Sequence, residues 1–309
     1  MEKNKQSALE GIKPSEFVKN ALVVSRFGQE ADVELVSGEQ LRCHLRRKFQ
    51  DLICGDQVLC DIEAPGKGIV VELLPRKSLL QRPIRYQGLK PVAANIDQIC
   101  VVVSPEPEFS CLVLDKYLVA CEQAQIAPLI IFNKSDRLTS YPKITHELKV
   151  YEDLGYKILF TSSLGNRSIQ PLIDALKDHS SVFVGQSGVG KTSLTKLLLP
   201  QILSPIGEIS AVSGLGMHTT TASRLYHLPH GGTVIDSPGI REFSLEFLDQ
   251  QALMNGYKEI EQASSQCRYR NCIHLREPQC QVKKLVEEKI IDSGRYQRYL
   301  KLVNEQMSS

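Results

Sequence analysis

The sequence has no long hydrophobic run and little excess of either charge. None of its 309 residues belongs to a stretch of eighteen apolar residues, and the first residues, MEKNKQSALEGIKPSEF, lack an apolar signal-peptide core. These absences argue against export and membrane insertion, so we expect a cytoplasmic protein without a membrane partner. The formal net charge of +2 identifies no class of partner. We find neither an internal repeat nor a low-complexity segment, which argues against a repeat architecture.

A disulfide framework is also not expected. In a chain without an export signal, the nine cysteines are better interpreted as core residues or metal ligands. Six of them show no clustering and are interpreted as core: Cys43, Cys54, Cys60, Cys100, Cys111 and Cys121.

Basic residues gather in two short stretches. LRCHLRRKFQ (41–50) contains four, and PRKSLLQRPIRYQGLKP (75–91) contains five and no acid. Both stretches fit a polyanionic partner, and both also fit an ordinary solvated basic face.

Hydrophobic patterning divides the chain into domains. Between residues 21 and 74, five short β-rich runs alternate with turn clusters, which predicts a five-stranded β-barrel of the OB type, a fold that binds nucleic acid or serves as a spacer. Further along, apolar strands alternate with helical segments around 111–125, 142–154 and 168–177, which predicts an α/β domain with a parallel sheet. The predicted boundaries are a tail (1–20), the barrel (21–75), a basic linker (76–94), the α/β domain (95–243) and a mostly helical C-terminal domain (244–309).

A phosphate-binding loop follows the predicted strand SVFV. The motif GQSGVGKT (185–192) precedes the apolar helix TSLTKLLL, which is the context that a P-loop requires. Its backbone N–H groups would hold phosphate oxygens, Lys191 would neutralise phosphate charge, and the Thr192 hydroxyl would ligate Mg²⁺. The predicted nucleotide contacts here are Gly185, Gln186, Ser187, Gly188, Val189, Gly190, Lys191, Thr192 and Ser193.

A guanine-reading motif, NKSD (133–136), follows the strand PLIIF. Asp136 can accept hydrogen bonds from both the N1–H and the exocyclic amino group of guanine, a pair of donors that adenine does not present on that edge. Asn133 would contact the other edge of the base, and Lys134 would lie along the plane of the base. Two further segments follow strands. The loop of Thr161, Ser162 and Ser163 is expected to close over the base, and Asp236 and Gly239 of DSPG are expected near Mg²⁺ and the γ-phosphate.

The order of these motifs is inverted relative to an ordinary GTP-binding domain, because NKSD precedes the P-loop. Ligands of parallel sheets gather at the carboxyl ends of the strands whatever the connections between them, so the inversion need not break the site. It predicts a circular permutation, in which the chain passes from DSPG directly into the C-terminal domain.

That domain contains a cluster of metal-ligand residues. Cys267, Cys272, His274 and Cys280 supply three thiolates and one imidazole, the ligand set of a closed structural zinc site. Three unrelated buried cysteines are the alternative. A basic and aromatic set surrounds the cluster and could meet RNA or be only a solvated face: Arg268, Tyr269, Arg270, Arg276, Lys283 and Lys284.

Together, the barrel, NKSD, GQSGVGKT, HTTT (218–221), DSPGIREF (236–243) and CRYRNCIHLREPQC (267–280) resemble the RsgA family of ribosome small subunit-dependent GTPases. The resemblance extends over nearly the whole chain. It implies a bacterial, Mg²⁺-dependent GTP hydrolase with one structural zinc, which docks on 16S rRNA of the 30S subunit late in its maturation and leaves after hydrolysis. It also implies that GRYQRYLKLV (294–303) completes the zinc domain.

The chain departs from the family pattern near the first switch segment. Met217 stands where the family usually has arginine, Leu215 where glycine or arginine is common, and Ser163 where alanine is usual. A phosphate or RNA contact made by the family's arginine is therefore not expected here.

The residue after DSPG, Ile240, cannot orient the attacking water as a glutamine does in many GTPases. The nearest polar candidate is His218, which we predict to be catalytic together with Lys191; the alternative is that His218 only packs or caps the loop. Thr220 joins Thr192 and Asp236 as a predicted Mg²⁺ ligand, with Thr219 and Thr221 as the alternatives to Thr220.

The predicted function is GTP hydrolysis to GDP, used as a timing switch on the immature 30S subunit, by a chain expected to be monomeric by default. Two alternatives stay open. One is an RNA-binding assembly factor with a structural nucleotide. The other is a zinc-containing GTPase acting on another RNA or in metal handling.

Overall fold

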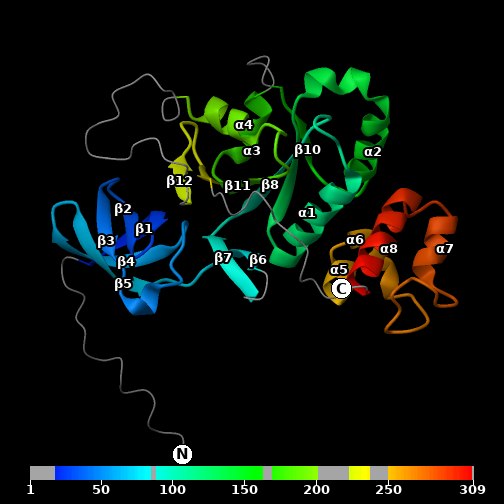
Figure 1. The fold of residues 1–309 in the computed structure, drawn as a ribbon, viewed down its shortest axis with the longest axis horizontal. Coiled ribbons are helices and arrows are strands. Elements are labelled where there is room, and N and C mark those ends of the chain that lie inside the picture. The colour runs from blue at the N-terminus through cyan, green and yellow to red at the C-terminus, as the bar shows by residue number, and fades with distance from the viewer. Residues whose placement is uncertain (1–17, 85–87, 163–168, 201–222, 237–249, 308–309) are drawn as a thin grey trace, which may run out of the picture.

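The computed structural model describes residues 18–84, 88–162, 169–200, 223–236 and 250–307. Most of the predicted tail (1–20) lies outside these ranges. Figure 1 shows three units in a row, with the barrel at one end, the α/β domain in the middle and the helical domain at the other end. Among the described residues, no helix combines the length and apolarity needed to cross a bilayer.

The first unit is a closed five-stranded barrel, as predicted. Its strands are β1 (Val18–Phe27), β2 (Glu30–Leu35), β3 (Gln40–His44), β4 (Gln57–Ala64) and β5 (Lys67–Leu73), with the short 3-10 helix η1 (Arg47–Phe49) between β3 and β4. The pairing order is β1-β2-β3-β5-β4, and β1 pairs again with β4 to close the barrel. Strand β1 starts at Val18 instead of Ala21, because Val18 pairs with Asp61 of β4.

Alternation along each strand fills the barrel interior. In β3 the side chains of Leu41 and Cys43 are buried while Arg42 and His44 are exposed. Apolar side chains of all five strands form one core, which also contains Phe49 of η1 and Leu52.

The segment that the sequence indicates only as a basic linker forms a β-hairpin. Strands β6 (Leu79–Ile84) and β7 (Gly88–Ala94) pair antiparallel, and Leu80 and Ala93 are fully buried in the core of the α/β domain. Ahead of the hairpin, Arg76 binds the buried carboxylate of Asp56 in the barrel, with Nε 2.7 Å from Oδ1. One of the predicted basic residues therefore stabilises the fold.

The α/β domain has one sheet with strands in the order β10-β9-β8-β11-β13-β12. The strands are β8 (Gln98–Val103), β9 (Ala127–Phe132), β10 (Ile158–Phe160), β11 (Ser180–Val184), β12 (Arg224–His227) and β13 (Thr233–Asp236); all neighbours are parallel except β12 and β13. The intervening helices are α1 (Cys111–Ala124), η2 (Ser135–Ser140), α2 (Pro142–Asp153), α3 (Gln170–Leu176) and α4 (Lys191–Leu198).

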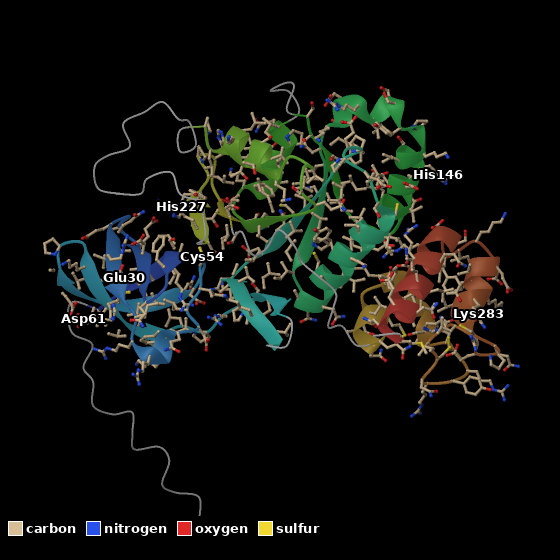
Figure 2. The ribbon with its side chains drawn as sticks, viewed as in Figure 1. Glu30, Cys54, Asp61, His146, His227 and Lys283 are labelled. Carbon is tan, nitrogen blue, oxygen red and sulfur yellow. The ribbon has the colours of Figure 1, made fainter. Side chains whose placement is uncertain are left out.

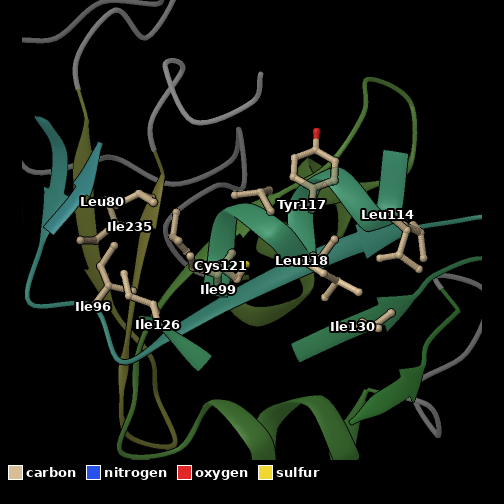
Figure 3. Packing of buried hydrophobic residues seen from close by; sticks show 14 of the residues in the cluster. Leu80, Ile96, Ile99, Leu114, Tyr117, Leu118, Cys121, Ile126, Ile130 and Ile235 are labelled. Carbon is tan, nitrogen blue, oxygen red and sulfur yellow. The ribbon is translucent and has the colours of Figure 1, made fainter. Parts of the chain in front are cut away.

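Helices cover both faces of this sheet. Ile99 and Val101 of β8 belong to the core cluster that contains Leu114 and Leu118 of α1 (Figure 3). The alternate residues of β8, Cys100 and Val102, belong to a second cluster with side chains of α3 and α4. Because both faces are covered, β8 is buried along its whole length.

Strand β12, which the sequence patterns did not predict, joins the barrel to the sheet. It pairs antiparallel with β13, and Arg224 is the partner of Ser25 in β1. Near this junction His227 Nε2 lies 2.8 Å from Glu34 Oε1, and Figure 2 shows His227 and Cys54 between the two units.

The last unit contains α5 (Gln250–Asn255), α6 (Lys258–Ser264), α7 (Gln281–Glu287) and α8 (Ser293–Met307). It packs on α1, because Val119 of α1 is buried in the core of this unit. A Cβ at Gly256 would lie 2.5 Å from Val119 Cγ1, so glycine permits the close approach. The mixed α/β fold, the closed barrel and the helical C-terminal domain confirm the predicted fold class.

Candidate nucleotide site and metal centre

The predicted phosphate loop connects β11 to α4 and depends on its glycines. Gly185, Gly188 and Gly190 have φ angles of 140°, 82° and 99°. A Cβ would lie 2.2 Å from Val102 O at Gly185, and 2.2 Å from Asn133 Nδ2 at Gly190. Positive φ and close packing both exclude larger residues at these two positions, so this backbone is built for a tight turn.

Lys191 lies over the loop at the start of α4. Its ammonium donates hydrogen bonds to the carbonyls of Gly185 and Gln186, at 2.5 and 2.6 Å. Thr192 and Ser193 are exposed on the first turn of the helix. A cation, hydroxyl groups and the helix N-terminus therefore meet at one place, which suits a polyphosphate.

The predicted guanine motif touches this loop directly. Asn133 is fully buried; its Nδ2 donates to Val189 O at 2.9 Å and its Oδ1 accepts from Thr161 Oγ1 at 3.1 Å. In the structure, both polar ends of Asn133 therefore hold neighbouring loops, while its predicted contact with a base stays a prediction.

Lys134 makes a second bridge between the two loops. It adopts a left-handed conformation with φ of 55°, and its Nζ donates to Gly188 O at 2.9 Å and to Glu106 O at 3.0 Å. Two residues further on, Asp136 is exposed and accepts a hydrogen bond from Ser162 Oγ at 2.5 Å. The NKSD motif, the Thr161–Ser162 segment and the phosphate loop thus form one site, although about fifty residues separate the motifs in the chain.

Asp236 ends β13, the strand that pairs with β11, and is partly exposed. It therefore stands at the same edge of the sheet as the phosphate loop. Four predicted site residues, Ser163, His218, Thr220 and Gly239, lie outside the described residues, as do Leu215, Met217 and Ile240. Their roles remain predictions from the sequence.

Sequence patterns missed a group that holds the residues directly after the guanine motif. Glu106, in the segment between β8 and α1, accepts hydrogen bonds from Arg137 Nη1 and from Tyr141 OH. Its position in the sequence could have identified it, because Glu106 comes just after the carboxyl end of a parallel strand, where the ligand-facing groups of such sheets gather.

The C-terminal cluster has the dimensions of a metal site. The ligand atoms of Cys267, Cys272, His274 and Cys280 all lie within 4.8 Å of one another. His274 Nδ1 is 3.3 Å from the Sγ atoms of Cys272 and Cys280 and 3.6 Å from that of Cys267, and the Cys267 and Cys280 sulfurs are 3.9 Å apart. Ordinary zinc bond lengths in a tetrahedron give separations of about 3.5 to 3.8 Å, so the four residues fit Zn²⁺.

The residues around the cluster orient its ligands. Tyr296 OH donates to His274 O at 2.6 Å, and Glu277 Oε1 accepts from the backbone N–H of Ile273 at 2.8 Å. Burial raises the pKa of the Cys272 thiol to about 12 and lowers the pKa of His274. A neutral imidazole is the form that binds a metal, while a buried thiol becomes a thiolate only next to a cation.

A family model described as RsgA GTPase matches residues 73–246. The small ribosomal subunit biogenesis GTPase RsgA of Haemophilus influenzae (strain PittGG) is 43% identical over 291 residues, which span 92% of this chain and 84% of that protein. The chain belongs to the RsgA GTPase family. RsgA 1 of Vibrio parahaemolyticus is 44% identical over 300 residues, spanning 94% and 85% of the two chains.

Solved structures agree with this membership. The crystal structure of YjeQ from Thermotoga maritima has a TM-score of 0.78 and 31% identity, with coverage of 94% of this chain and 99% of that one. YloQ, described as a circularly permuted GTPase, has a TM-score of 0.75, 27% identity and coverage of 96% and 98%. The fold shared with these structures confirms the circular permutation predicted from the motif order, and membership of the family confirms the predicted GTPase activity.

Proposed function

We propose that this RsgA GTPase acts on the small ribosomal subunit during its assembly, and that GTP hydrolysis is stimulated there and coupled to release. The relatives at 43% and 44% identity are named small ribosomal subunit biogenesis GTPases. The observation that carries the GTP-hydrolysing part of the proposal is the joined site, in which Asn133 and Lys134 bind carbonyls of the phosphate loop. A base reader and a phosphate holder fixed to each other bind the two ends of one guanine nucleotide.

Each part of the joined site has its own task. Asp136 recognises guanine, the backbone of residues 185–192 cradles the phosphates, and Lys191 exchanges its bonds with loop carbonyls for bonds with phosphate oxygens. Thr192, Asp236 and Thr220 would hold Mg²⁺, which neutralises charge on the phosphates when bound. His218 accepts a hydrogen bond from the attacking water and so orients it, a task that Ile240 cannot perform.

Two exposed basic faces suit an RNA partner. A groove on the barrel is lined by three arginines and one acid, Asp51, together with Gly28, Gln29, His44, Leu45 and Gln50; the arginines are Arg26, Arg46 and Arg47. Arg46 and Arg47 are exposed and make no ion pair with other residues in the described ranges, so their charge is available to phosphates. On the zinc domain, Arg268 stacks over the exposed ring of Tyr269 at 5.6 Å, which offers a cation and an aromatic surface to nucleotides.

Further parts of the proposal concern the bound groups and the cell. One structural zinc occupies the Cys₃His cluster, GTP and GDP alternate in the nucleotide site, and 16S rRNA is the surface contacted on the 30S subunit. The chain acts as a monomer in the cytoplasm.

GTP turnover with and without purified 30S subunits tests the proposal. The double variant Arg46→Glu/Arg47→Glu should keep the basal rate and lose most of the stimulation, because the barrel then repels phosphates. Lys143→Glu/Lys149→Glu on α2 is the control with the same change of charge, and it should stay stimulated. If 30S subunits fail to stimulate the parent protein, the proposal of a subunit-dependent activity is wrong. If they stimulate the barrel variant fully, docking through this face is wrong.

A further inference from the structure

Three atoms of Glu106 contact the guanine motif and the residues just after it. One carboxylate oxygen, Oε2, binds Nη1 of Arg137, and the other, Oε1, accepts from Tyr141 OH at 3.2 Å. Its backbone carbonyl accepts from Lys134 Nζ at 3.0 Å. Glu106 is not among the predicted nucleotide contacts, and all three of these bonds join it to other residues of the protein.

These contacts enclose the turn that carries Asp136. The N–H of Arg137 bonds Lys134 O at 3.0 Å, which closes the turn around Ser135 and Asp136. Lys134 and Arg137 are the two ends of that closing bond, and each is also bound by Glu106. Glu106, which comes from a different loop, therefore binds both residues that close the turn presenting Asp136.

The segment of Glu106 lies against the phosphate loop. Ser104 Oγ donates to Glu106 O at 2.5 Å, and Pro107 lies 3.5 Å from the position that a Cβ on Gly188 would take. A displacement of this segment would therefore reach the guanine turn and the phosphate loop together.

We propose that Glu106 is a positioning residue for guanine specificity, acting through Arg137 and Tyr141 on the turn that presents Asp136. The proposal rests on the assignment of Asp136 as the guanine reader. The side chains of Glu106 and Arg137 are 36% and 51% exposed, so water screens their attraction and we expect a modest effect on specificity.

The test measures the dissociation constants of GDP and of inosine diphosphate, which lacks the exocyclic amino group. Guanine uses two bonds to Asp136 and hypoxanthine only one, so misorientation of Asp136 should penalise GDP more. Glu106→Ala should lower the preference for GDP over inosine diphosphate by about threefold to tenfold. Glu106→Gln, whose amide oxygen still accepts one hydrogen bond, should recover part of the preference.

Matched variants separate this role from general loosening. Glu108→Ala removes the same charge from the same segment, but no hydrogen bond joins Glu108 to the guanine turn within the described residues, and its preference should equal that of the parent. Arg137→Ala should reproduce the effect of Glu106→Ala, and the double variant should lose no more than either single one. Arg137→Ala also carries the test if Glu106→Ala does not fold.

An unchanged preference in Glu106→Ala and Arg137→Ala, or an equal weakening of both ligands, would overturn the proposal. Asp136→Asn serves as the reference, and it should shift the preference toward xanthosine diphosphate. If it does so while the Glu106 variants behave as the parent, only the role of Glu106 fails. If Asp136→Asn leaves base preference unchanged, the guanine reader itself is misassigned.

Discussion

The carboxylate of Asp115 on α1 accepts a hydrogen bond from Nη1 of Arg295 on α8, at 2.7 Å, and both side chains are almost completely buried. Arg298 and Tyr151 also bind this carboxylate, at 2.5 and 2.6 Å. Burial lowers the pKa of Arg295 while Asp115 and Glu259 raise it, and the net direction is upward. Two charged arginines and one shared acid therefore join the GTPase domain to the zinc domain.

Replacement of Asp115 should consequently weaken that junction. Asp115→Ala leaves Arg295 buried without its main partner, and we expect a loss of about 3 to 5 kcal/mol in the free energy of unfolding. Lys116→Ala is the control on the same helix, because Lys116 meets Glu305 of α8 only at the surface, at 3.5 Å, and should cost less than about 1 kcal/mol. Denaturant unfolding measures both, and equal losses in the two variants would contradict a stabilising role for the buried network.

Recognition of guanine gives the second prediction. Asp136→Asn should weaken GTP binding strongly and improve binding of xanthosine triphosphate. The amide NH₂ of asparagine can donate a hydrogen bond to the 2-oxo group of xanthine, whereas the 2-amino group of guanine needs an acceptor at that position. Binding titrations with both nucleotides measure the change. An unaltered affinity for GTP would remove Asp136 from the base site.

The phosphate loop and the barrel could be predicted because their signals are local. Gly185 and Gly190 need φ angles that other residues rarely adopt, and residues 41–44 alternate visibly between buried and exposed. The hairpin β6–β7 could not be predicted from the sequence, because Pro91 and Gly88 interrupt the strand pattern. The hairpin is stabilised by burial of Leu80 in the core of the α/β domain, which local sequence does not show. The bonds of Glu106 were equally invisible, since they join loops that only the fold brings together.

Zinc content is the subject of the third prediction. The purified protein should hold about one equivalent of zinc, and Cys272→Ser should lower that content and loosen the C-terminal domain while nucleotide binding is retained. Metal analysis and limited proteolysis measure these effects. Cys121→Ser is a suitable control, since Cys121 of α1 is buried in the core of the α/β domain and not in that of the zinc domain. Zinc-free protein with a protease-resistant C-terminal domain would contradict the metal assignment.

The catalytic assignment gives the last prediction. Lys191 sits on the phosphate loop, and Lys191→Ala should impair nucleotide binding and both the basal and the 30S-stimulated rates of hydrolysis. His218→Ala should instead keep GTP binding and most of the slow basal rate, yet lose most of the stimulated rate, because the imidazole is needed only when docking orders the switch segment around the attacking water. Single-turnover hydrolysis with saturating 30S subunits distinguishes the two variants. Full stimulation of His218→Ala would show that another group orients the water, and the GTPase assignment would still stand.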